Sequence, residues 1–114
     1  MELDLREEHG TTRFVVTNDE PWVPATFFAQ LDRMSAKLMK ALRNPDTKLL
    51  FDFSGAEHLD SSIISLLVQA VRMAGSRRVS IVTPHSETAN LLHLMGIDKL
   101  ADVHESLEDY RGSA

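Results

Sequence analysis

The chain has 114 residues, of which 43% are hydrophobic and 25% are charged, and its formal net charge is −5. These values are typical of one globular domain that is long enough to bury a core without disulfides or metal ions. An acidic chain without a cluster of Lys and Arg is a poor candidate for binding nucleic acid or an anionic membrane surface. Because the sequence contains no cysteine, disulfides, thiolate metal sites and Cys nucleophiles are excluded.

The N-terminal segment does not resemble a signal peptide. Residues 1–8 alternate charged and apolar side chains and lack the apolar stretch that such a peptide needs. Nowhere does an apolar run approach the roughly 20 residues required to cross a bilayer. We therefore expect a single domain over residues 1–114, without membrane contact, in the cytoplasm.

The first third of the chain predicts a hairpin followed by a helix. Residues 3–5 alternate apolar and charged side chains, residues 13–17 are β-branched and aromatic, and Gly10 lies between the two segments. Pro24 suits the first turn of a helix, because a backbone N–H at that position makes no hydrogen bond within the helix and its absence costs nothing. The helix continues to the break at 44–46. Its apolar stripe has helical spacing and consists of Phe27, Leu31, Met34, Leu38 and Leu42.

Strands and helices alternate through the rest of the sequence. The strand at 48–53 is almost continuously apolar, which indicates burial on both faces. The later elements are a helix over 60–74, a strand over 78–83, a helix over 86–95, a strand over 101–104 and a terminal helix that ends near residue 112. We expect Ser86 to cap the helix over 86–95 and Gly96 to end it. Ser106 and Asp109 resemble a capping box for the terminal helix.

This order of elements predicts the fold class. Strands that alternate with helices of this length imply right-handed crossovers and a largely parallel central sheet. The opening hairpin makes the sheet mixed. We therefore expect an α/β domain in the order ββαβαβαβα, with a mixed, mostly parallel sheet and about four helices.

The most informative segment is the strand, loop and helix over 49–71, in which the helix begins with Asp60-Ser61-Ser62. A serine hydroxyl at a helix start lies beside unpaired backbone N–H groups and the positive end of the helix dipole. A phosphate is favourably held there, and a partner protein can reach the hydroxyl. Asp and Ser are also favoured helix caps, so the residues alone favour a cap and leave a switch site as the alternative.

Three pieces of sequence, in this order and spacing, resemble the STAS domain of bacterial anti-sigma factor antagonists over roughly residues 48–110. The pieces are Phe51-Asp-Phe-Ser-Gly-Ala-Glu-His-Leu-Asp-Ser-Ser62, Val79-Ser-Ile-Val-Thr83 with its following helix, and Leu94-Met-Gly-Ile-Asp-Lys-Leu-Ala-Asp-Val-His-Glu-Ser106. The resemblance implies that Ser61 is phosphorylated by a partner anti-sigma factor that is an ATP-dependent serine kinase. It also implies that the unphosphorylated protein binds this kinase, which frees its sigma factor, and that a phosphatase resets the cycle.

The second helix supports a partner surface beginning at this serine. Its polar residues recur at three- and four-residue steps beside an apolar stripe. The family usually continues the motif with Gly-Leu-Gly, whereas this chain has Ile63-Ile64-Ser65 and thus a branched side chain at Ile63, next to the acceptor. The expected partner-binding residues are Asp60, Ser61, Ser62, Ile63, Ser65, Gln69 and Arg72. The alternative is an ordinary solvated helix face.

Asp52 supports a rival interpretation as a two-component receiver domain. A carboxylate in a central strand, with Asp19 and Glu20 after an earlier strand, could hold Mg²⁺ and accept phosphate on Asp52. However, Phe53 continues the strand, so that Asp52 need not reach the edge of the sheet. The acidic pair also follows the second strand of a hairpin, and a lysine after the last strand is missing. We therefore prefer the STAS interpretation.

The sequence offers little support for catalysis. It contains no Gly-x-Ser-x-Gly nucleophile elbow and no Gly-rich phosphate loop. The five histidines are scattered, and none forms a convincing ligand motif with a carboxylate, so we expect no metal and no cofactor. The expectation is a binding module, monomeric when free, that is a kinase substrate and not an enzyme. A constitutive scaffold or stress-signalling subunit, in which Ser61 only caps the helix, is the alternative within the same fold.

Overall fold

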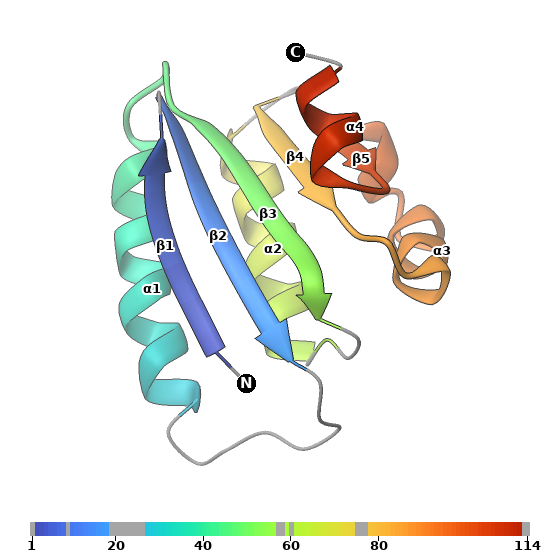
Figure 1. Ribbon diagram of the computed structural model, residues 1–114. Helices are drawn as coiled ribbons and strands as arrows, with labels where there is room; N and C mark the ends of the chain where they lie inside the picture. Colours follow the sequence, from blue (N-terminus) through green and yellow to red (C-terminus); the bar gives the residue numbers. More distant parts are fainter. Residues whose placement is uncertain are drawn as a thin grey trace.

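The computed structural model describes residues 2–8, 10–18, 27–56, 59, 61–74 and 78–112 (Figure 1). Within these ranges the elements follow the order expected from the sequence. They are β1 (Glu2–Glu8), β2 (Thr11–Asn18), α1 (Phe27–Leu42), β3 (Lys48–Ala56), α2 (Ser61–Ala74), β4 (Val79–Val82), α3 (Ser86–Leu94), a 3-10 turn η1 (Ile97–Lys99), β5 (Asp102–His104) and α4 (Leu107–Gly112). The predicted ββαβαβαβα order is confirmed.

One sheet contains the five strands of the described ranges in the order β1-β2-β3-β4-β5. β1 and β2 form the expected antiparallel hairpin, and the other neighbouring strands are parallel. Gly10 lies in the hairpin turn with φ of 81°, a conformation that glycine adopts without a steric penalty. The mixed, mostly parallel sheet predicted from the sequence is therefore confirmed.

The core lies between this sheet and the helices α1 and α2, which share one side of it in Figure 1. Leu5, Phe14, Phe51 and Ile81 are paired in register across four neighbouring strands. The ring of Phe51 lies 5.5 Å from that of Phe14 and 5.9 Å from that of Phe53, measured between ring centroids. An aromatic row along the centre of the sheet thus forms the middle of the core.

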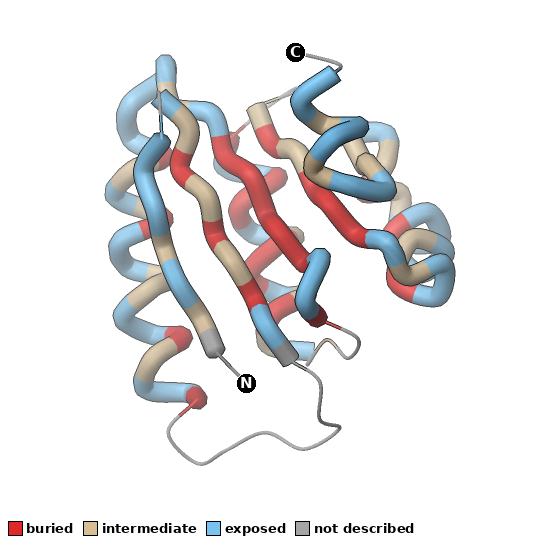
Figure 2. Tube along the Cα trace, in the orientation of Figure 1, coloured by how far each residue is buried: buried red, intermediate tan, exposed pale blue. Residues whose placement is uncertain are grey.

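The central strand β3 is buried on both faces, as its apolar run indicates. Every residue from 49 to 53 is buried, and Figure 2 shows this strand as a continuous buried stretch. Leu49, Phe51 and Phe53 belong to the main core cluster, whereas Leu50 and Asp52 do not. Because side chains alternate along a strand, Leu50 and Asp52 belong to the other face of the sheet.

Three helix boundaries test the capping predictions. Ser86 is not the cap of α3: the N-cap is His85, whose extended backbone accepts the first helical bond from Ala89 N–H at 3.1 Å, so the helix begins one residue earlier than a Ser86 cap requires. Gly96 ends this helix as expected, with φ of 77°. Ser106 caps α4, because its Oγ accepts a hydrogen bond from the Asp109 N–H at 3.0 Å.

The apolar stripe of α1 is confirmed as well. Phe27, Leu31, Leu38 and Leu42 are buried, and Met34 packs against the core from a partly buried position. The predicted position of Pro24 in the first turn lies outside the described residues. Of the helices that the structure describes, none combines the length and apolar character needed to cross a membrane.

Candidate functional site

Ser61 is the first residue of α2 and its side chain is exposed. The first backbone N–H groups of an α-helix have no acceptor within the helix, so this end of α2 offers unpaired donors and the positive end of the helix dipole. Ser62 follows in an intermediate position. Asp60, which the sequence analysis placed in the same site, lies outside the described residues.

The apolar residues of α2 fix which residues face outward. Its buried residues are Ile63, Leu66, Leu67, Ala70, Val71 and Ala74. They recur at three- and four-residue steps, so the opposite side of the helix faces solvent. Ser65, Gln69 and Arg72 are exposed on that side and continue the line that begins at Ser61. Of the residues proposed for the partner surface, the structure thus brings Ser61, Ser65, Gln69 and Arg72 together along one side of α2.

Ile63 does not belong to that surface. Its side chain is fully buried in the core cluster together with Leu67 and Ala70, so it cannot contact a partner while the helix stays packed. Ile63, which the sequence analysis placed among the partner-binding residues, thus lies on the core side of α2 and not on its exposed side. The next residue, Ile64, has an intermediate exposure and lines the surface beside Ser61.

A groove of about 730 Å³ extends along this surface, and the sequence analysis did not predict it. Its lining residues come from the outer side of α2 with Leu59 before it, and from α3 with Met95 directly after it: Leu59, Ser61, Ile64, Ser65, Val68, Gln69, Arg72, Met73, Leu91 and Met95. The sequence analysis assigned the apolar residues of α3 no surface role. The missed signal is the spacing of Leu91 and Met95, which lie four residues apart on one side of the helix, while Leu92 is the buried one.

Exposed apolar side chains concentrate around this groove. Met73 is 53% exposed, Leu91 44% and Met95 43%, and all three line the groove. Large apolar side chains gathered on one surface mark interaction sites more often than isolated ones do. The groove therefore combines a reachable serine at one end with apolar contact area along its length.

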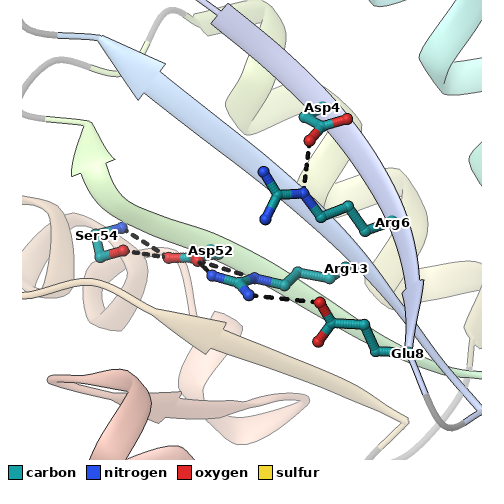
Figure 3. A network of polar contacts seen from close by, with 6 residues as sticks. All are labelled: Asp4, Arg6, Glu8, Arg13, Asp52 and Ser54. Carbon is teal, nitrogen blue, oxygen red and sulfur yellow. Dashed lines mark hydrogen bonds and ion pairs between the residues drawn. The ribbon is translucent and has the colours of Figure 1, made fainter.

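Asp52 belongs to a separate network on the other face of the sheet (Figure 3). Ser54 donates to Asp52 Oδ1 from its backbone N–H at 3.0 Å and from its hydroxyl at 2.5 Å. Arg13 donates to Oδ2 from Nε at 3.0 Å and also from Nη2, and its Nη1 lies 3.8 Å from Glu8 Oε1. Burial raises the pKa of Asp52, but the hydrogen bonds from Ser54 and Arg13 outweigh it and hold the pKa below its ordinary value.

This geometry argues against the receiver interpretation. Asp52 is 1% exposed, and both of its oxygens accept hydrogen bonds from protein donors. A guanidinium occupies the position next to the carboxylate where a metal ion would have to bind. Asp19 and Glu20, the other proposed ligands, lie outside the described residues. Within the described ranges, no three acidic, His or Cys side chains are grouped so that they could hold a metal.

Two histidines do pair with carboxylates, which the sequence analysis did not anticipate. His93 Nδ1 lies 2.6 Å from Asp98 Oδ2, and His104 Nδ1 lies 3.4 Å from Asp109 Oδ2. The hydrogen bond with His93 lowers the pKa of Asp98, although burial opposes it. Each pair joins residues five apart in sequence, so both are local contacts that hold the turns around η1 and α4.

A second hollow lies at the end of the sheet where β3 begins, whereas Ser61 follows the opposite end of β3. It has a volume of about 820 Å³ and is formed by the turn of the hairpin, the last turns of α1 and the loop before β3. Glu7 and Glu8 line it together with Lys37 and Lys40, so its charges are of both signs. None of the residues proposed from the sequence as a site lies in it.

Comparisons with known proteins agree with this arrangement. The family model described as "Mlab, STAS domain" matches residues 28–104. The structure of an anti-sigma-factor antagonist (STAS) domain protein from Planctomyces limnophilus is similar, with a TM-score of 0.68 and 17% identity over 95% of this chain and 93% of that one. A crystal structure of a protein from Thermotoga maritima, described as a candidate anti-sigma factor antagonist, gives a TM-score of 0.67 and 12% identity over 97% and 92%. No curated protein matches the sequence.

Proposed function

This chain belongs to the STAS domain family, and on that premise we propose that it is an anti-sigma factor antagonist that acts by binding a partner and not by catalysis. The partner in this proposal is an anti-sigma factor that is a serine kinase, or a related switch kinase, which supplies the nucleotide and Mg²⁺. Phosphorylation of Ser61 releases the partner, and a phosphatase restores the binding form.

One observation carries the proposal: the Ser61 side chain is exposed at the first residue of α2, at one end of the groove between α2 and α3. A kinase that binds this surface can reach the hydroxyl without unfolding any element. The same hydroxyl then lies within the contact area, so that a modification there changes the interface directly. Ser65, Gln69 and Arg72 extend this surface along the helix.

Physical chemistry explains how one phosphate could switch binding while the fold stays intact. A phosphoserine adds about −1.5 to −2 charges. At a helix N-terminus these charges are favourably placed, because the unpaired N–H groups and the helix dipole attract anions. In an interface, the same charges must lose their water and meet the partner's own groups. The free phosphoprotein is therefore stable, whereas its complex is weakened.

The first test is mass spectrometry of the protein isolated from its native host. Trypsin releases residues 49–72 as one peptide, which carries Ser54, Ser61, Ser62 and Ser65, so fragment ions must separate these positions. We expect a phosphate on Ser61. Absence of phosphate from this peptide under several growth conditions, with full coverage, contradicts the switch and favours a constitutive scaffold.

A second test compares the affinities of Ser61→Ala and Ser61→Asp for the kinase that co-purifies with the protein. We expect Ser61→Asp to bind at least tenfold more weakly than Ser61→Ala, measured by calorimetry. Ser86→Asp is the matched control, because Ser86 is also an exposed first residue of a helix but does not line the groove. Equal affinities for the two Ser61 variants contradict the proposal.

A further inference from the structure

We propose that the groove between α2 and α3 binds one amphipathic helix of the partner, with the apolar side of that helix against Met73, Leu91 and Met95 and an acidic residue paired with Arg72. This inference deepens the proposed function and rests on it. It specifies which structural element of the partner occupies the surface that begins at Ser61 and what chemistry that element carries.

The length of the groove fits a short helix. Its lining follows α2 from Ser61 to Met73. At a rise of about 1.5 Å per residue, these twelve steps span about 18 Å, which equals about three turns of a second helix laid alongside. Leu91 of α3 and Met95, the C-cap of that helix, are four residues apart and form the facing wall.

The lining is apolar where such a helix would press against it. Ile64 and Val68 lie one turn apart on α2 with intermediate exposure, and Met73, Leu91 and Met95 are roughly half exposed. An amphipathic helix places apolar side chains at three- and four-residue steps on one face, which matches this spacing. The two methionines add adaptable side chains that can adjust to the occupant.

The walls of the groove favour a helix over an extended peptide. Both walls are helices, whose backbone N–H and C=O groups are bonded within each helix except at the ends. An extended segment gains main-chain hydrogen bonds when it joins a strand edge, and the groove has no strand in its described lining. A helix satisfies its own backbone groups and needs no such edge.

Charge identifies the acidic character of the occupant. Among the described residues that line the groove, Arg72 carries the only formal charge. The N-terminal end of α2 adds the positive end of a helix dipole beside Ser61. A phosphate on Ser61 would therefore repel an acidic helix from the end of the groove at which α2 begins.

Site-specific photo-crosslinking in the native host tests which element occupies the groove. A benzophenone amino acid replaces Met73 in one variant and Leu94 in another, and mass spectrometry identifies the crosslinked peptide. We expect position 73 to give at least tenfold more crosslinked product than position 94, because Leu94 is exposed on α3 but does not line the groove. The peptide should come from an acidic segment with apolar residues at helical spacing.

Other crosslinking results overturn the inference. These are a basic or strand-forming segment at position 73, a segment of a second copy of this chain, and equal yields from positions 73 and 94. Absence of a crosslink at position 73, in a variant that still co-purifies with the kinase, also overturns it.

Affinities for the crosslinked partner test the two kinds of contact separately. We expect Leu91→Lys and Arg72→Glu each to weaken binding at least tenfold. Leu94→Lys and Arg33→Glu are the matched controls, since they make the same changes at exposed positions outside the groove lining and should bind like the wild type. Circular dichroism checks that every variant is folded.

The Ser61 variants separate failure of this inference from failure of the proposed function. If Ser61→Asp weakens binding but Leu91→Lys and Arg72→Glu do not, the phosphoserine switch stands and the helix-binding groove is refuted. If the groove variants weaken binding and the two Ser61 variants bind equally, the groove is supported and the switch is refuted.

Discussion

Asp52 illustrates how one residue can hold two distant parts of the chain together. It lies on β3 and accepts hydrogen bonds from Arg13 on β2, 39 residues earlier, and from Ser54 two residues later. Breaking a buried ion pair leaves the remaining charge without a partner, at a cost of several kcal/mol. The side chain of Arg13 is only 15% exposed, so it cannot turn fully to water.

We therefore expect Asp52→Asn to lower the free energy of unfolding by about 3 kcal/mol at pH 7, measured by urea denaturation. Asp4→Asn is the matched control, because Asp4 pairs with Arg6 in a contact where both side chains are more than half exposed. That pair is screened by water, so its loss should leave the urea midpoint unchanged. Equal midpoints for wild type and Asp52→Asn contradict a structural role for the pair.

The same comparison has a defined pH dependence. Because the folded protein holds the pKa of Asp52 below its unfolded value, the ionised carboxylate contributes stability above the unfolded pKa, about 3.9. This contribution is lost as the pH falls from there through the folded pKa. The difference in stability between wild type and Asp52→Asn should therefore shrink on acidification below about pH 4. A constant difference down to pH 2.5 contradicts this assignment.

At the scale of the elements, the end of α3 depends on the conformation of Gly96. Its φ of 77° lies in the left-handed region, where a Cβ clashes with the backbone, although no other atom lies within 4 Å of a Cβ at this position. The strain of a substitution there is thus purely local. The turn also leads directly into η1, which places Ile97 in the core.

Gly96→Ala should lower the free energy of unfolding by about 1 kcal/mol, measured by thermal or urea denaturation. Gly112→Ala is the control, since Gly112 also has open space around its Cβ position but no positive φ. If both variants have the stability of the wild type, the left-handed turn after α3 does not form in solution.

The elements also show where sequence reasoning succeeds and where it stops. The apolar run of β3 and the stripe of α1 predicted burial correctly, because these periods depend only on the geometry of one strand or helix. The sequence did not show that Ile63 is fully buried or that Leu91 is partly exposed, because a period does not say which neighbour an apolar side chain meets. The side chain of Ile63 is buried in the core, whereas that of Leu91 lines the groove between α2 and α3.

The candidate site was predictable in part for the same reason. The position of Ser61 at the start of a helix follows from local sequence, and the outward line to Arg72 follows from the buried side of α2. The groove needs α3 to lie beside α2, which the crossover from β4 determines. The partners of Asp52 likewise come from a different strand, so only the tertiary structure reveals them.

For the molecule as a whole, stability depends on the aromatic row in the sheet. Phe51→Ala removes a fully buried ring that contacts the rings of Phe14 and Phe53, and we expect a loss of about 3–5 kcal/mol in urea denaturation. Phe28→Ala is the control, because Phe28 is 54% exposed and should matter far less. Equal losses for the two variants contradict a core centred on β3.

The parallel pairing of β2 with β3 has a consequence for the speed of folding. The β1–β2 hairpin joins neighbours in sequence and closes a short turn at Gly10, whereas β2 meets β3 only after the segment that carries α1 has been looped out. Closing such a loop costs entropy before its contacts form, so pairing of this kind is slow. A shift of one residue in the register of this pairing would turn Arg13 toward the core. Because burying this charge in the core is unfavourable, the correct register is favoured. We therefore expect the pairing of β2 with β3 to form more slowly than the β1–β2 hairpin.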